Sequence, residues 1–323
     1  MSAENQEIDL EREPPQLPGF THFLAWFPAN PLNGLQIALI AAVLIYFYGF
    51  LKLFSGNRDS TLSWWWSNWQ APSEYEHGKL VAILCFVLVW RLRLRLLEAT
   101  KAFSWLGVPV LAFGIALFLL STRMVQARFA VASLPIVILG IVLIVCGNRT
   151  ARLLLFPLFF SYLVIPIPSL EQATFQLQFV ISNVATAFLQ VFGVATATIG
   201  TTLKASGDDF FFEIAGGCSG VRSLMAMAML TAIYVYLTQD RLWKQLLIFA
   251  CSLVFATVGN IGRVVTIVLI ARFYDREFAA GLYHDYSAFI FFPIALGAMV
   301  LFSNLVNLNY GTWFRSMTKN AAS

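Results

Sequence analysis

The chain has 323 residues, of which 59% are hydrophobic and 12% are charged, and its mean hydropathy is +0.74. Soluble globular domains contain about 25% charged residues, so the composition excludes a soluble enzyme and indicates an integral membrane protein. The formal net charge is only +4, and the basic residues fall in short loops rather than in one patch. Nucleic-acid binding is therefore not expected.

The apolar stretches predict an all-α fold, a polytopic membrane helix bundle of about eight transmembrane helices. Each crossing needs about 20 predominantly apolar residues. The expected spans are 35–54, 78–92, 103–121, 127–146, 153–167, 219–237, 245–265 and 286–307. They form one membrane domain, 35–307, between an N-terminal segment, 1–34, and a C-terminal tail, 308–323. The N-terminal segment starts acidic, unlike a secretory signal peptide, and is expected to remain uncleaved.

Lysine and arginine residues predict the orientation of these spans, because basic residues collect in cytoplasmic loops. They follow the second, fourth, sixth and eighth spans: Arg91, Arg93, Arg95, Lys101, Arg149, Arg152, Arg241, Lys244, Arg315 and Lys319. Both termini are then cytoplasmic, and the long segment 168–218 faces outward.

The outward segment contains two predicted elements. Residues 171–192 mix Gln, Asn and Thr with apolar residues at near-helical spacing, which predicts an interfacial helix on the outer leaflet or a ninth span. Residues 195–216 have β-rich arms around ASGDD, which predicts a short β-hairpin that returns the chain to the membrane just before Cys218.

Cys218 has the setting of a nucleophile. Gly216, Gly217 and Gly220 leave the thiol open to a substrate, while a helix N-terminus and Arg222 favour the thiolate. The alternative is a small residue at a tight junction between loop and helix. The other cysteines lie within apolar stretches, where they are expected to serve as small buried hydrophobic residues: Cys85, Cys146 and Cys251.

Two further polar residues lie at outward ends of expected spans, at the same depth as Cys218. Arg263 follows Asn260 by one turn, and an arginine in an apolar segment usually faces an interior or a wet cavity. His284 precedes the last span and suits the role of acid/base partner. A snorkelling arginine and a polar interface histidine are the alternatives. No metal is expected, because Cys218 and His284 lack two further ligands.

Several motifs in this order resemble the exosortase/archaeosortase family of membrane cysteine transpeptidases. They are YEHG at 75–78, VWRLRLR at 89–95, GCSGVRSL at 217–224, NIGR at 260–263, and His284. The resemblance covers most of residues 60–305. It departs from the family at Gly216, where an acidic residue is common, and at Glu76, where serine is usual.

The resemblance implies cleavage of exported proteins that end in a recognition motif, a transmembrane helix and a basic tail, of the PEP-CTERM kind. It implies a thioester at Cys218, an oxyanion partner at Arg263, a general acid at His284, and no cofactor. The acceptor would be a cell-surface polysaccharide or a lipid, at the outer face of an inner membrane. The implied secondary site residues are Arg222, His77, Asn260, Ser219 and Gly217.

Two other classes compete with this interpretation. A multi-pass transporter has polar residues near the bilayer midplane and often repeated halves, whereas the polar residues here gather at one end. A structural subunit of an exopolysaccharide export system needs no exposed cysteine.

Overall fold

The computed structural model describes residues 31–54, 59–70, 77–99, 102–165, 168–200, 202–205, 211–213 and 220–308. Most of the N-terminal segment and of the C-terminal tail, together with Gly217, Cys218 and Ser219, therefore lies outside the described residues. The chain divides into two compact units, Met1–Ser63 and Trp64–Ser323.

The described part of the first unit begins with helix α2 (Pro31–Leu44), which continues into a π-helical turn, η1 (Ile45–Phe50). Strands β1 (Lys52–Phe54) and β2 (Asp59–Ser60) follow and pair antiparallel. The expected span 35–54 is therefore wrong at its end. Leu51 is extended, with ψ 113°, and this terminates the helix.

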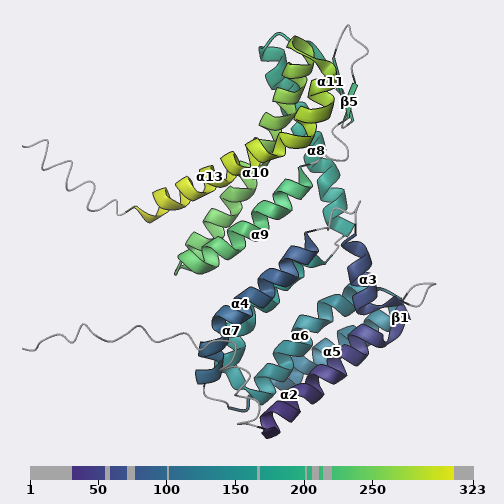
Figure 1. The fold of residues 1–323 in the computed structure, drawn as a ribbon, viewed down its shortest axis with the longest axis vertical. Helices are drawn as coiled ribbons and strands as arrows, with labels where there is room; N and C mark the ends of the chain where they lie inside the picture. Colours follow the sequence, from purple (N-terminus) through teal and green to yellow (C-terminus); the bar gives the residue numbers. More distant parts are fainter. Residues whose placement is uncertain are drawn as a thin grey trace, which may run out of the picture. The chain divides into compact units, whose positions relative to one another are not determined.

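Helix α3 (Thr61–Asn68) leads into the second unit, whose first part is helical. Its elements are α4 (Gly78–Glu98), α5 (Gly107–Met124), α6 (Ala127–Val145), α7 (Gly147–Phe160) and the 3₁₀ turn η2 (Ser161–Val164). Helices α5 and α6 pack closely (Figure 1). A Cβ at Gly140 would lie 2.6 Å from the backbone nitrogen of Leu111, so glycine permits this close approach, as is common between membrane helices.

The second part of this unit carries the residues of interest. Its elements are α8 (Pro168–Val191), β3 (Thr196–Ile199), β4 (Thr202–Ala205), β5 (Phe211–Glu213), α9 (Val221–Thr238), α10 (Leu242–Phe273), α11 (Arg276–Phe278), the π-helical turn η3 (Ala279–Tyr283), α12 (His284–Tyr286) and α13 (Ala288–Asn307). Helix α10 packs against both α9 and α13 (Figure 1).

Five helices of the described chain are long and apolar enough to cross a membrane: α5, α6, α9, α10 and α13. The protein is thus a membrane protein with several apolar helices, while the count of eight spans stays a prediction. Helix α4 has 21 residues, but its second half carries Arg91, Arg93 and Arg95. Helix α7 has only 14 residues before the 3₁₀ turn.

The segment before α9 forms a three-stranded antiparallel sheet in the order β3-β4-β5, rather than the single hairpin expected. The pairing of β4 with β5 corresponds to the expected arms around ASGDD. The additional pairing joins β3 to β4, with Thr198 opposite Leu203. Gly200 makes this second turn possible because it adopts φ +65°, a conformation that favours glycine.

Helix α8 begins before the expected range 171–192 and ends one residue short of it, and it packs one face against the rest of this unit. Ile181, Ala185 and Leu189 recur every four residues and are fully buried in a cluster with Val264 and Ile267 of α10. The same hydrophobic cluster also includes Leu203 of β4. The helix and the sheet therefore pack around the second half of α10.

Candidate active site

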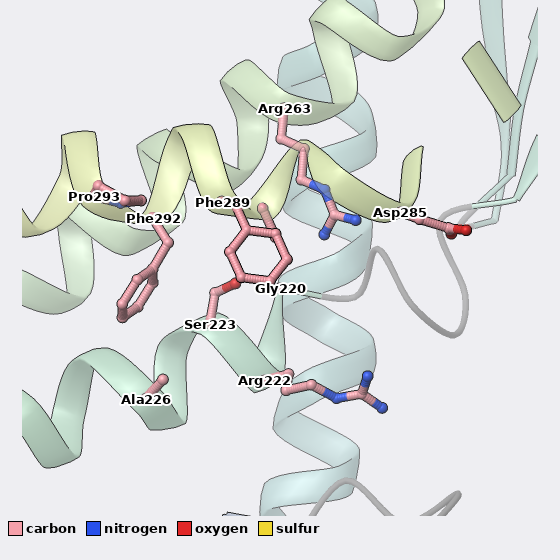
Figure 2. Close-up of a pocket in the computed structure, with 10 residues that line it drawn as sticks. Gly220, Arg222, Ser223, Ala226, Arg263, Asp285, Phe289, Phe292 and Pro293 are labelled. Carbon is pink, nitrogen blue, oxygen red and sulfur yellow. The ribbon is translucent and has the colours of Figure 1, made fainter. Parts of the chain in front are cut away.

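A pocket of about 320 Å³ lies where the start of α9 meets α10 and the start of α13. Figure 2 shows a polar side formed by arginines and an aspartate, and an aromatic side formed by phenylalanines of α13. Its lining residues are Gly220, Arg222, Ser223, Ala226, Arg263, Asp285, Ala288, Phe289, Phe292 and Pro293.

Gly220 follows Cys218 by two residues in the sequence and directly precedes α9. It adopts a left-handed conformation, with φ +74° and ψ −11°, directly before the first helical residue. A Cβ at this position would lie 2.6 Å from Nδ2 of Asn260, whose side chain is buried. The GCSGVRSL and NIGR motifs, which are distant in sequence, therefore meet at the start of α9.

Arg263 is the buried cation of the pocket. Only 7% of the residue is exposed, so its guanidinium needs hydrogen-bond partners that compensate for lost hydration. Its Nε donates to Ser287 Oγ at 2.8 Å, and its Nη2 donates to the backbone carbonyl of His284 at 2.8 Å. In Figure 2 the side chain extends from α10 towards the pocket. These contacts distinguish it from a snorkelling anchor.

His284 contacts Arg263 with its main-chain carbonyl and not with its imidazole ring. Its Nδ1 is 3.1 Å from Oδ1 of Asp285, and the two side chains are 27% and 71% exposed. Asp285 lines the pocket, while His284 is not among the lining residues. The structure therefore brings the Arg263 side chain to the His284 backbone and pairs the imidazole with a neighbouring carboxylate.

The remaining predicted residues divide between the pocket and other regions. Arg222 is exposed and lines the pocket from α9, opposite the α10 side from which Arg263 extends (Figure 2). His77 directly precedes α4 and is not a lining residue. The adjacent Gly78 packs closely on the Trp69 indole, where a Cβ would clash with Nε1, so the glycine of the YEHG motif has a packing role.

Two polar residues of the site were missing from the sequence-based set. Asp285 contacts the His284 ring, and Ser287 contacts the Arg263 guanidinium. The sequence feature that could have identified them is their position: both follow His284 within one helical turn, in the stretch HDYS. A histidine that lies near a membrane surface with polar neighbours at this spacing indicates a hydrogen-bonded group rather than an isolated side chain.

The profile of the transmembrane exosortase family matches residues 64–301. This range includes all the lining residues of the pocket and the GCSGVRSL and NIGR motifs. No curated protein and no solved structure matches the chain significantly.

Proposed function

The chain belongs to the transmembrane exosortase family, and from this premise we propose that it is a membrane cysteine transpeptidase that uses Cys218 as its nucleophile. Its substrates would be exported proteins held in the same bilayer by a C-terminal transmembrane helix that follows a short recognition motif and precedes a basic tail. The observation that carries the proposal is the pocket, where residues of the GCSGVRSL and NIGR motifs meet and where Arg263 contacts the main chain of His284.

The lengths of the helices support a site at one membrane surface. At 1.5 Å per residue, Arg263 lies about 32 Å along the α10 axis from Leu242, which is close to the roughly 30 Å thickness of the hydrocarbon core. Helices α9 and α13 have 18 and 20 residues, so their lengths are about 27 and 30 Å. With the N-terminal ends of α9 and α13, which follow Gly220 and His284, facing outward, the pocket would lie at the outer surface.

Chain connectivity relates Cys218 to this pocket. Cys218 lies outside the described residues, two positions before the lining residue Gly220. Two trans peptide units separate Cα atoms by at most about 7.6 Å. A substrate bond held in the pocket would therefore lie within reach of the thiol.

In the proposed first step, the Cys218 thiolate attacks the scissile carbonyl carbon, a C–S bond forms, and the carbonyl π electrons move to oxygen. The Arg263 guanidinium stabilises this oxyanion. When the C=O bond re-forms, the C–N bond breaks and the leaving nitrogen takes a proton from the His284 imidazolium, which holds the proton that the Cys218 thiol gave up. The products are a thioester on Cys218 and a free amine on the released helix and tail.

In the second step, an acceptor nucleophile attacks the thioester carbonyl and loses its proton to His284, and the Cys218 thiolate leaves. A cell-surface polysaccharide or a membrane lipid would serve as the acceptor, and water in that position would make the reaction a hydrolysis. Asp285 holds the Nδ1 side of the ring, so proton transfer would use Nε2. The proposed location is an inner membrane, with both termini cytoplasmic and the pocket facing outward.

An acyl-enzyme trap tests this function. A tagged protein from the same cell that ends in an apolar helix and a basic tail is incubated with membranes that contain the full chain. We expect a covalent adduct between its N-terminal part and the enzyme, released by hydroxylamine and absent from the Cys218→Ala protein. An adduct that forms equally with Cys218→Ala would overturn the proposal.

Thiol labelling of intact cells discriminates the alternative functions. A transporter or an export subunit needs no reactive outward thiol. A membrane-impermeant thiol reagent applied to intact cells should therefore label the unchanged protein and not Cys218→Ala. Labelling that is unaffected by this substitution would favour the alternatives.

A further inference from the structure

Arg263 and the segment Tyr283–Ser287 are joined by several hydrogen bonds. The guanidinium donates to Ser287 Oγ and to the His284 carbonyl, both at 2.8 Å. Ser287 Oγ in turn donates to the same His284 carbonyl at 3.1 Å. The three groups form a small ring in which the serine hydroxyl is both acceptor and donor.

A second connection links the same two segments one turn further along α10. The Tyr283 hydroxyl donates to Thr266 Oγ1 at 2.9 Å, and Thr266 Oγ1 donates to the Arg263 carbonyl at 2.9 Å. The main chain around Arg263 and the main chain around His284 are thus connected independently of the guanidinium. Loss of the Ser287 hydroxyl would therefore leave the segments joined.

Ser287 is completely buried, and its backbone is held without its hydroxyl. Its N–H donates to the Tyr283 carbonyl at 2.8 Å, and its own carbonyl accepts from Ile290 and Phe291. The start of α13 does not depend on Oγ. Oγ instead affects the orientation of the Arg263 guanidinium. Because this group is planar, an acceptor that holds Nε also fixes the direction of the two Nη atoms.

We propose that Ser287 is a positioning residue for Arg263: its hydroxyl holds Nε and thereby sets the direction in which the guanidinium faces the pocket. This inference rests on the proposed function, in which Arg263 stabilises the oxyanion. Oxyanion stabilisation requires donors fixed in advance near the position where charge develops. Without the Ser287 hydroxyl, Nε would lose the acceptor at 2.8 Å that sets the direction of the guanidinium plane.

The test is a double-mutant cycle with the full-length chain in membranes. The processing rate of a tagged protein of the same cell, ending in an apolar helix and a basic tail, is measured at matched amounts of inserted enzyme. Ser287→Ala should slow processing by about 10- to 100-fold, the size of effect that a misplaced catalytic group produces. In the Arg263→Lys background the same substitution should change the rate by less than about twofold, since its effect passes through the guanidinium.

Ser252→Ala is the matched control. Ser252 is also a completely buried serine, on α10, and its hydroxyl donates only to the Phe249 carbonyl one turn earlier. The Ser252→Ala protein should process substrate at a rate within about twofold of that of the unchanged chain. The Arg263→Lys arm is followed long enough to measure a rate about 1,000-fold below normal.

Two outcomes would overturn the inference: a normal rate for Ser287→Ala, or an equal slowing by Ser287→Ala in both backgrounds, which a purely structural role gives. Cys218→Ala in the same assay separates this result from the proposed function. If Cys218→Ala is inactive and Ser287→Ala is normal, only the role of Ser287 is lost. If Cys218→Ala is fully active, the proposed function itself fails.

Discussion

Gly220 lies so close to the side-chain amide of Asn260 that a Cβ at position 220 would come within 2.6 Å of Nδ2. The glycine also adopts φ +74°, which costs a residue with a side chain about 1–2 kcal/mol. The close contact and the positive φ both occur at the residue that directly precedes α9, two positions after Cys218. The glycine is therefore required at this position for its conformation and for its small size.

The first prediction is that Gly220→Ala abolishes most substrate processing. The added methyl group must displace Asn260 or the start of α9, and either movement changes the pocket between Gly220 and Arg263. We expect a loss of at least about 10-fold in processing rate. The measurement is accumulation of uncleaved tagged substrate at matched enzyme amounts.

Gly193→Ala is the control for this substitution. Gly193 has nearly the same conformation, φ +77°, but no atom lies within 4 Å of its potential Cβ. The two variants should share a stability loss of about 1–2 kcal/mol from backbone strain, and Gly193→Ala should retain activity. Equal activity losses in both would show that strain alone, rather than contact with Asn260, explains the effect.

Hydropathy and helical spacing predicted most of the helical elements, because long apolar stretches and membrane length constrain them strongly. Helices α5, α6, α9, α10 and α13 all overlap expected spans, although α10 continues to Phe273, beyond the expected end at 265. The errors occur where local backbone geometry decides. Residues Lys52–Phe54, expected in the first span, form a strand that pairs with β2. A turn at Gly200 adds a third strand to the expected hairpin.

For the site, the sequence predicted where residues lie along the helices but not which atoms they contact. The spacing of Asn260 and Arg263 on one helix predicted that both lie at one end of the bundle, and the two residues do line one region. No sequence pattern indicates which acceptors a buried guanidinium selects. The contact of Arg263 with Ser287 and with the His284 main chain depends on the break between α12 and α13 at Ser287, which periodicity does not reveal.

The second prediction separates Cys218 from the other cysteines. Cys218→Ala should abolish processing, because no other thiol precedes a pocket-lining helix start. Cys85, Cys146 and Cys251 are half-buried within helices or at their ends, and Cys85 Sγ donates weakly to the Pro157 carbonyl at 3.5 Å. Alanine at any of these three should cost about 1 kcal/mol of stability and leave processing intact. A normal rate for Cys218→Ala would end its assignment as nucleophile.

The third prediction concerns the orientation of the helices in the membrane. Reporter fusions after Arg95, Arg152 and Lys244 should report the cytoplasm, because basic residues concentrate there. Fusions near Ser206 and Arg276 should report the outside. The readout is a pair of reporters active on opposite sides of the membrane. A cytoplasmic signal at Ser206 would contradict an outward-facing pocket and with it the proposed substrate approach.

The fourth prediction is that Arg263→Lys inserts normally but loses most of its activity. Lysine retains a positive charge and can reach a membrane surface, but it lacks the planar fork that holds Ser287 Oγ and the His284 carbonyl simultaneously. Loss of one oxyanion contact typically lowers the rate by about 100- to 1,000-fold. The measurement is the rate at which uncleaved substrate disappears, normalised to enzyme in the membrane.

Arg222→Lys is the matched comparison, because Arg222 lines the same pocket from α9 but is exposed. An exposed cation at the pocket edge contributes mainly through screened electrostatic attraction, which lysine also supplies. Arg222→Lys should therefore slow processing by less than about 10-fold, well short of the loss expected for a missing oxyanion donor. If Arg263→Lys processes substrate at the normal rate while Arg222→Lys does not, the oxyanion role belongs to Arg222, and the buried guanidinium of Arg263 serves only to hold α10 against the segment Tyr283–Ser287.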